Sequence, residues 1–176
     1  HTIADGIAVK QPGKITFQLI QKYVDDIVVV KDDDIAATIL LLMERAKMIA
    51  EGAGAISLAG ILHGSLPNVG KTAAVISGGN IDVNMISRVI ENGLVKSGRR
   101  IKLVTHLTDR PGELLKFISF IKENRANIIF IHHEHAGRNL PIGQTQVEMD
   151  LETRDHAHGE IIIAALRRAG YRVELI

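Results

Sequence analysis

Ala74-Val-Ile-Ser-Gly-Gly-Asn-Ile-Asp82 is the stretch of sequence on which the fold of this chain depends. The small and β-branched residues at 72–76 predict a strand that is buried on both faces. The segment 77–80 ends that strand, and a helical pattern follows over 82–92. Two glycines after a buried strand let a ligand approach the backbone closely, and a helix N-terminus favours an anion. From the residues alone, a ligand-binding turn and a plain strand-to-helix connection explain this pattern equally well.

Four blocks in the first half of the chain resemble a known family. Ile76-Ser-Gly-Gly-Asn-Ile-Asp82 is similar to the C-terminal cofactor signature of the threonine dehydratases and serine racemases, which are β-family pyridoxal-phosphate (PLP) enzymes. Thr2-Ile-Ala-Asp-Gly6, Val24-Asp25-Asp26 and Glu51-Gly-Ala-Gly-Ala55 agree with the family in order and spacing. The resemblance implies an α/β fold, in which residues 1–95 are the C-terminal part of a PLP-dependent catalytic domain of fold type II.

The resemblance also implies which residues bind the cofactor. Ser77 matches a family serine whose hydroxyl hydrogen-bonds the pyridine nitrogen of PLP, and Gly78 and Gly79 make room for the ring. Asn80 is expected to organise the turn, and Glu51 is expected near the ring. A neutral hydroxyl at the ring nitrogen gives a weaker electron sink than a carboxylate would, which suits α,β-elimination.

Two parts of the family's active site have no match in these residues. They are the lysine that holds PLP as a Schiff base and the glycine-rich loop that cradles the phosphate. The chain begins at His1, and residues 2–6 already resemble the middle of a domain. We therefore expect the C-terminal part of a longer enzyme, and we predict that the chain alone contains no catalytic residue and is inactive.

The composition excludes several other classes of protein. The 176 residues have a formal net charge of +1 and only 3% aromatic residues, which argues against a nucleic-acid-binding surface. Without cysteine the chain has no disulfide, thiolate nucleophile or zinc–thiolate site. No apolar run is long enough to cross a membrane, and no signal peptide is visible. These features lead us to expect a cytoplasmic protein.

Periodicity predicts the elements of the first domain. Apolar residues at helical spacing predict helices at 14–23 and 34–49, and a small-residue helix that begins near Glu51. A short buried strand is expected at 27–30. The acidic run 32–34 is more easily explained by the helix N-terminus than by a metal site. Asn92-Gly93 is expected to stop the helix at 82–92, followed by a polar linker over 93–100.

Two glycine-containing motifs suggest nucleotide binding, but neither matches a nucleotide-binding motif in full. Glu51-Gly-Ala-Gly-Ala55 lacks the third glycine of a dinucleotide fingerprint and follows a helix instead of a strand. Gly64 to Thr72 is similar to a phosphate-binding P-loop, but its two glycines are one residue too far apart. We reject both interpretations.

The second domain, 96–176, has a different pattern. Strands are predicted at 101–107, 127–135, 144–153 and 171–176, helices at 114–124 and 161–170, and a hairpin loop at 137–143. This β-α-β-β-α-β order is typical of a ferredoxin-like fold. Together with the turn Asp109-Arg-Pro-Gly-Glu-Leu114, the pattern resembles an ACT regulatory domain.

ACT domains typically bind amino acids between paired modules. Gly112 permits close approach of a ligand, and the amides that follow it can bind a carboxylate. Asp109 can receive a ligand ammonium group, and Asn127 can hydrogen-bond either end of the ligand. The predicted regulatory-ligand residues are therefore Asp109, Gly112, Leu114 and Asn127. A helix cap without a ligand, in a module that serves mainly as an interface, is the alternative.

Histidines at 132, 133, 135, 156 and 158 suggest a metal site. On a strand, His133 and His135 share one face while His132 lies on the other, so the cluster is divided. We expect a solvated or dimer-facing strand and no metal.

The sequence therefore predicts part of a threonine ammonia-lyase (dehydratase) that converts threonine or serine into a 2-oxo acid and ammonia with PLP. Its ACT domain would sense an amino acid such as isoleucine or valine, as in isoleucine biosynthesis, within a homodimer or homotetramer. The alternatives are a serine racemase or serine dehydratase, and a stand-alone amino-acid-binding regulatory module. No nucleic acid or membrane partner is expected.

Overall fold

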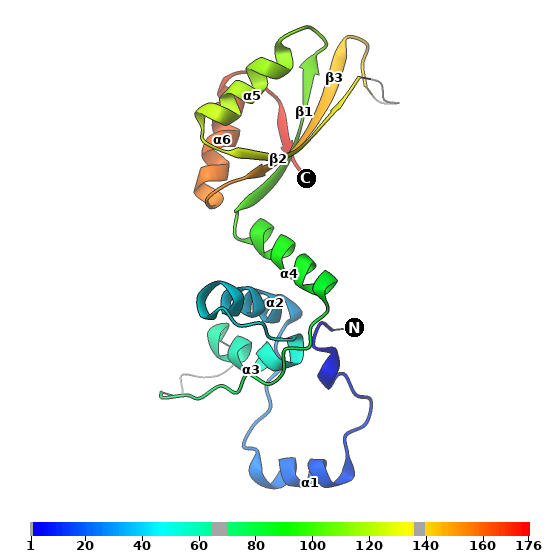
Figure 1. The fold of residues 1–176 in the computed structure, drawn as a ribbon, viewed down its shortest axis with the longest axis vertical. Helices are drawn as coiled ribbons and strands as arrows, with labels where there is room; N and C mark the ends of the chain where they lie inside the picture. Colours follow the sequence, from blue (N-terminus) through cyan, green and yellow to red (C-terminus); the bar gives the residue numbers. More distant parts are fainter. Residues whose placement is uncertain (1, 65–69, 136–139) are drawn as a thin grey trace. The chain divides into compact units, whose positions relative to one another are not determined.

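A computed structural model describes residues 2–64, 70–135 and 140–176 of the chain. The chain divides into two compact units, residues 1–93 and 94–176. Each unit has its own hydrophobic core. Figure 1 shows the helices and strands of both units.

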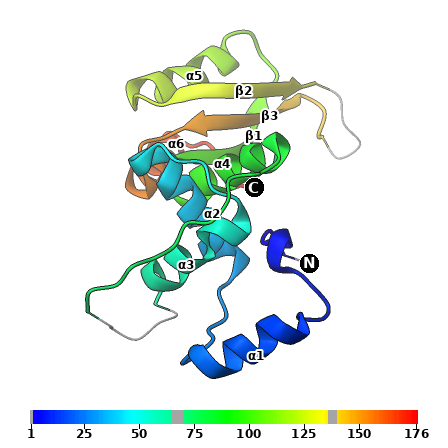
Figure 2. The ribbon, with the colours of Figure 1, turned by 60° about the horizontal axis from the view of Figure 1, so that its bottom comes forward.

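The first unit is helical. Its elements are η1 (Asp5–Ile7), α1 (Lys14–Tyr23), α2 (Asp32–Leu41), the π-helical turn η2 (Leu42–Ala46), α3 (Gly52–Leu62) and most of α4 (Val83–Lys96). Helices α2 and α3 pack side by side (Figures 1 and 2). Ile35 and Ile39 of α2, together with Ala55 and Ala59 of α3, are at most 1% exposed. Small residues on α3 allow this close contact.

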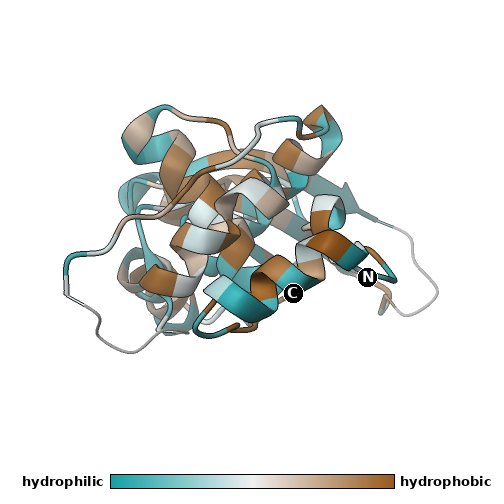
Figure 3. Ribbon diagram, turned by 90° about the horizontal axis from the view of Figure 1, so that it is seen from below, coloured by the Kyte–Doolittle hydropathy of each residue, from teal (hydrophilic) through white to brown (hydrophobic). Residues whose placement is uncertain are grey.

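Helix α1 has the bounds that the sequence predicts, although its apolar side has no partner among the described residues. Ile15 is 74% exposed and Tyr23 is 67% exposed. Hydrophobic and hydrophilic residues alternate along the helical ribbons, as Figure 3 shows, so the periodicity correctly predicts an amphipathic helix. Burial of its apolar side does not follow from the pattern.

The two strands predicted in this unit are wrong. Residues 27–30 and 72–76 are irregular, and no described residue of 2–64 or 70–93 lies in a strand. Val29 is 90% exposed and Val75 is 74% exposed. A strand needs a hydrogen-bonded neighbour for its backbone groups. No neighbouring strand exists in the described part of this unit, so β-branched residues alone do not produce one.

The predicted stop at Gly93 is also wrong, because α4 continues to Lys96. A Cβ on Gly93 would collide with the end of the Leu40 side chain, so this glycine leaves room for that side chain beside α4. The helix ends instead at Gly98, which has φ +68°. The amide of Arg99 donates to the carbonyl oxygen of Leu94 at 2.8 Å, which is the Schellman pattern of a helix C-terminus. The polar linker expected over 93–100 is therefore a helix end followed directly by a strand.

The second unit is an antiparallel sheet with two helices. Its elements are β1 (Arg100–Thr108), α5 (Glu113–Glu123), β2 (Asn127–Glu134), β3 (Gln144–Glu152), α6 (His156–Arg168) and β4 (Val173–Leu175). The strand order is β2-β3-β1-β4, which confirms the predicted ferredoxin-like topology. The predicted loop at 137–143 and the P-loop-like segment fall partly on 136–139 and 65–69, which lie outside the described residues.

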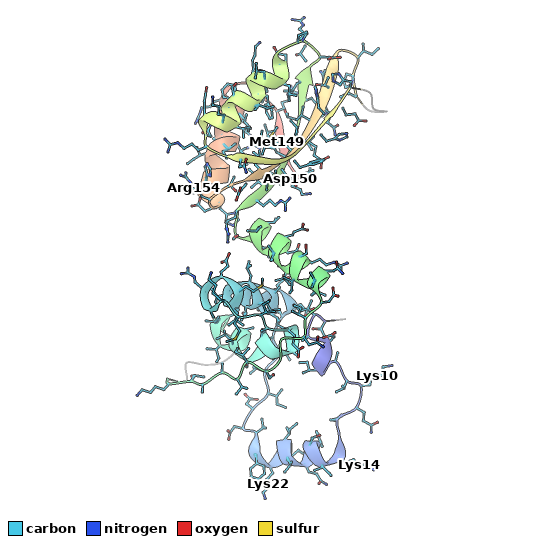
Figure 4. The ribbon with its side chains drawn as sticks, in the orientation of Figure 1. Lys10, Lys14, Lys22, Met149, Asp150 and Arg154 are labelled. Carbon is cyan, nitrogen blue, oxygen red and sulfur yellow. The ribbon has the colours of Figure 1, made fainter. Side chains whose placement is uncertain are left out.

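The core of this unit lies between one face of the sheet and the two helices. Leu103 of β1 pairs with Met149 of β3, and both side chains are fully buried. Phe117 of α5 and Leu166 of α6 pack on the same cluster. Asp150, which Figure 4 labels beside Met149, is the next residue of β3. It is also buried and accepts a hydrogen bond from Arg100 at 3.2 Å. The apolar residues of β3, which alternate along the strand as the sequence predicts, thus lie on the face of the sheet that the two helices cover.

No helix in the described part of the chain is both long and apolar enough to cross a membrane.

Candidate cofactor and effector sites

The N-terminus of α3 brings together three of the blocks that the sequence analysis identified. Glu51 is the N-cap residue of this helix, as expected. A Cβ on Gly52 would collide with the carbonyl oxygen of Ile3, and a Cβ on Gly54 would collide with the carbonyl oxygen of Ser77. The two glycines therefore let the segments around Ile3 and Ser77 pack directly on the first turn of α3.

Glu51 holds the turn at 77–80 through its backbone. Its amide donates to the carbonyl oxygen of Gly78 at 3.3 Å. Gly78 has φ +86°, a conformation that favours glycine, and a Cβ there would lie 2.6 Å from Oε1 of Glu51. The structure therefore brings the predicted site residues Glu51 and Gly78 together.

The other residues of the turn are exposed. Ser77, Gly79 and Asn80 face solvent, and no described residue hydrogen-bonds the Ser77 hydroxyl. The Asn80 side chain also has no hydrogen bond within the described part of the chain, so the turn is held by Glu51 and Gly54 instead. A free hydroxyl beside two glycines fits the pyridine end of PLP, because the ring nitrogen needs one hydrogen-bonding group and close access to the backbone.

Asp32 performs a role that the sequence analysis did not identify. The acidic run 32–34 lies in the first turn of α2, as expected, but it provides no side-chain cap. The Asp32 carboxylate instead accepts hydrogen bonds from the Thr2 hydroxyl at 2.5 Å and from the Ile3 amide at 3.2 Å. It therefore holds the segment that packs on Gly52. A contact across 30 positions has no signal in local periodicity.

A second candidate site lies at the turn between β1 and α5. Gly112 is the N-cap residue of α5, has φ +91°, and has open space where a Cβ would project. A cavity of about 310 Å³ adjoins it. The cavity is lined by Leu107, Thr108, Asp109, Arg110, Pro111, Gly112, Glu113, Leu114, His133, His135 and Thr145. Three of the four predicted ligand residues, Asp109, Gly112 and Leu114, are therefore together.

Asn127, the fourth predicted ligand residue, is not in this cavity. It lies at the start of β2, opposite Glu152, and its side-chain amide donates to the Glu152 carboxylate at 3.3 Å. His133 lies near the other end of β2, about 20 Å away at about 3.3 Å per residue. Within one chain the structure does not bring Asn127 to Gly112.

The cavity contains polar groups that the sequence analysis did not assign to it. Thr145 of β3 is 1% exposed, and its hydroxyl oxygen has no hydrogen-bond partner in the described structure. Nε2 of His133 is likewise buried without a partner. Buried polar atoms without partners are costly, so such atoms at a cavity wall favour a ligand that completes their hydrogen bonds. Strand alternation, which places His133 and Thr145 on the inner face, is the signal that identifies them.

His133 of β2 and His135, which follows the end of that strand, form a pair, as alternation predicts. The rings of His133 and His135 are 4.4 Å apart, and Nδ1 of His135 is 3.3 Å from Oδ1 of Asp109. Burial lowers the pKa of His133 from the usual histidine value, and the neighbouring His135 lowers it further. His133 therefore stays neutral at neutral pH. Within the described residues, no group of three or more histidine, aspartate or glutamate side chains could hold a metal ion.

Comparison with known proteins supports the family resemblance. Residues 1–78 match the family described as pyridoxal-phosphate dependent enzymes. The chain is 47% identical to L-threonine ammonia-lyase of Thermotoga maritima over 99% of its own length and 44% of the relative's. It shows the same identity and coverage with L-threonine ammonia-lyase of Geobacter sulfurreducens.

A third relative matches a smaller part of the chain. L-threonine dehydratase catabolic TdcB of Escherichia coli is 42% identical over 50% of this chain and 28% of the relative. The chain thus spans less than half the length of each of these relatives. By these similarities, residues 1–78 resemble the pyridoxal-phosphate dependent enzymes, and nearly the whole chain is similar to less than half of the L-threonine ammonia-lyases.

Proposed function

We propose that this chain supplies the pyridine end of the PLP site in a cytoplasmic threonine ammonia-lyase. The enzyme eliminates water and ammonia from L-threonine or L-serine and leaves a 2-oxo acid. The observation that carries this proposal is that the turn with Ser77, Gly78 and Gly79 is held against the N-terminus of α3 by the Glu51 amide and by close packing on Gly54. The 47% identity to two L-threonine ammonia-lyases supports the reaction and substrate class.

PLP, when bound, supplies the electron sink that allows a proton to leave the substrate α-carbon. The residues of this chain position the ring. With PLP bound, the Ser77 hydroxyl would hydrogen-bond the ring nitrogen without the negative charge that would hold a proton there, so PLP would be a moderate electron sink. Gly78 and Gly79 leave room for the ring, and the Glu51 amide holds the carbonyl of Gly78 so that the turn keeps its shape.

We propose that the chain is inactive when it is produced alone. Lys10, Lys14 and Lys22, which Figure 4 labels, are exposed on and around α1. Three further lysines of the first unit, Lys31, Lys47 and Lys71, are exposed as well. None of the six lies in a sequence that matches the family's lysine motif. Turnover therefore requires a lysine-bearing segment in addition to these residues.

The test uses the longest natural protein that contains this sequence. We expect it to release ammonia and a 2-oxo acid from L-threonine and, in a separate assay, from L-serine. Formation of D-serine from L-serine without ammonia would favour the serine racemase alternative and contradict the proposal. The same assay on the 176-residue chain tests its inactivity.

We also propose that residues 94–176 bind an amino-acid effector, such as isoleucine or valine, beside Gly112. The amides that begin α5 bind its carboxylate and Asp109 receives its ammonium group. Leu107 and Leu114 provide an apolar wall for an aliphatic side chain.

A second copy of the chain completes this site in the proposed homodimer or homotetramer. Strand β2 lies at an edge of the sheet, and its Ile129 and Phe130 are 47% and 52% exposed. An exposed edge strand is suited to pairing with another strand. Antiparallel pairing of two β2 strands would bring Asn127 of one copy to the end of β2 where Gly112 of the other copy lies.

Calorimetric titration with isoleucine, valine, threonine and serine tests the effector site. Saturable binding of one of them, lost in Gly112→Leu, is the expected result. Absence of binding by all four in the longest natural protein would contradict a regulatory role and leave the module as an interface.

A further inference from the structure

Asp109 and His135 face each other across the mouth of the Gly112 cavity. Oδ1 of Asp109 is 3.3 Å from Nδ1 of His135, and both residues line the cavity. The side chains are 47% and 59% exposed, respectively, so solvent protons reach both. Asp109 is also the carboxylate that we assign to the effector's ammonium group. The same oxygen atoms therefore serve two cations, a protonated histidine and a ligand ammonium.

The other charged groups around His135 do not remove this competition. The β1–α5 turn contributes Asp109 and Arg110, and α5 contributes Glu113. The Glu113 carboxylate already accepts a hydrogen bond from Lys116 at 2.7 Å. From the sheet, β2 contributes His133 and β3 contributes the uncharged Thr145. Asp109 is therefore the carboxylate available to both His135 and a ligand.

On the basis of the effector function proposed above, we propose that effector binding in this cavity is coupled to release of a proton from His135. When His135 is protonated, it pairs with Asp109 and occupies the position of the effector's ammonium group. When His135 is neutral, Asp109 is free to bind that group. The cavity thus responds to pH as well as to the concentration of an amino acid, and a bound effector favours the neutral histidine by the same coupling.

Histidine is suited to this role because it ordinarily titrates near pH 6.5. His133 reinforces the effect, since its ring lies 4.4 Å from that of His135 and gains positive charge only at lower pH. In acid the cavity therefore becomes more positive and repels an ammonium group. In neutral solution both rings are available as uncharged hydrogen-bonding groups for the effector.

The test measures isoleucine and valine affinity calorimetrically at pH 7.5 and pH 5.5, using the longest natural protein that contains this sequence. Affinity should be several-fold lower at pH 5.5 than at pH 7.5, because protonated His135 competes with the effector's ammonium group for Asp109. Titration at pH 6.5 in two buffers with different ionisation enthalpies should show release of protons on binding. The substitution His135→Gln should reduce the difference to about twofold or less, because glutamine has no ionised form.

His132→Gln is the matched control. His132 lies on β2 opposite Glu148, on the other face of the sheet from His133, so this variant should keep the pH dependence of the unmodified protein. Equal affinity at both pH values, or an unchanged dependence in His135→Gln, would overturn the proposal while leaving the effector site itself intact. Absence of binding at pH 7.5 would instead contradict the effector function on which the proposal rests.

Discussion

The amide of Glu51 donates a hydrogen bond to the carbonyl oxygen of Gly78 across 27 positions of the chain, at 3.3 Å. This bond joins the first turn of α3 to the turn that carries Ser77. The carboxylate of Glu51 lies beside Gly78 as well, so any side chain at position 78 would meet it. The shape of the proposed PLP site therefore depends on the glycines and the glutamate of α3 as much as on the turn itself.

The packing of the turn on Gly54 predicts a specific cost. Gly54→Ala should lower the free energy of unfolding of the first unit by about 1–3 kcal/mol, because the added Cβ would lie against the carbonyl oxygens of Ser77 and Gly78. Urea unfolding followed by far-UV circular dichroism measures this change. Gly60→Ala on the same helix meets only the Val30 side chain, at 3.3 Å, and should cost clearly less than Gly54→Ala, because a side chain can move where a backbone carbonyl cannot. Equal effects of the two substitutions would show that the turn does not depend on Gly54.

The effector site predicts a difference between two glycines of similar backbone conformation. Gly112 and Gly170 have φ +91° and +93°, and each has open space for a Cβ. Gly112→Ala and Gly170→Ala should each cost about 1–2 kcal/mol of stability, because left-handed backbone is unfavourable for alanine. Gly112→Ala alone should also weaken effector binding, since its methyl group enters the cavity. A similar loss of affinity in Gly170→Ala would indicate backbone strain as the common cause.

Core packing in the second unit is tested at Phe117. Its ring is fully buried and lies 5.0 Å from the ring of Tyr171, edge to face. Phe117→Ala should lower the free energy of unfolding of this unit by about 3–5 kcal/mol. Leu115→Ala, on the same helix but at a residue that is 70% exposed, should change it by no more than about 0.5 kcal/mol. Near-UV circular dichroism of Tyr171 follows the transition, because Tyr23, the other tyrosine, is exposed.

The pair of histidines predicts a titration that NMR can measure. Burial and the neighbouring His135 both lower the pKa of His133, so its ring signals should titrate below the usual value of about 6.5. The unfolded state then binds protons more readily, and His133 reduces stability as pH falls from about 6.5 through its folded-state pKa. His135→Gln removes the repulsion and should raise the pKa of His133, whereas burial should keep it below the usual value. An unchanged pKa in that variant would mean that the two rings are not coupled.

Much of the second unit could be predicted from the sequence, because local hydrophobic periodicity indicates its helices and strands and their order along the chain. Alternation in 144–152 places Val147, Met149 and Leu151 on the buried face. Helical spacing identifies α5 and the later part of α6, but α6 begins at His156, five residues before the predicted start, with Asp155 as its N-cap. The topology then follows from the order of these elements. Leu115 of α5 and Ile161 of α6 are exceptions, since their apolar side chains lie at helical spacing and are nevertheless 70% and 52% exposed.

The first unit was less predictable because its features depend on contacts between distant residues. The β-branched run at 72–76 lacks a neighbouring strand, and composition does not report whether a neighbour exists. Gly93 has the sequence pattern of a helix stop, but it packs on Leu40, while Gly98 provides the stop. The proposed sites show the same limit: motif resemblance identified Ser77, Gly78 and Glu51, but the contribution of Thr145 depends on a cavity that only the fold creates.

We propose above that the Ser77 hydroxyl binds the pyridine nitrogen of PLP in a threonine ammonia-lyase. This proposal is tested most directly by measuring PLP retention after dialysis, together with 2-oxo acid formation from L-threonine, in the longest natural protein that contains this sequence. Ser77→Ala should bind PLP up to about tenfold more weakly, as expected for loss of one hydrogen bond. Ser97→Ala, which removes an exposed hydroxyl that donates to the Leu94 carbonyl, should retain PLP and activity. Equal PLP retention and equal turnover in the two variants would contradict the account.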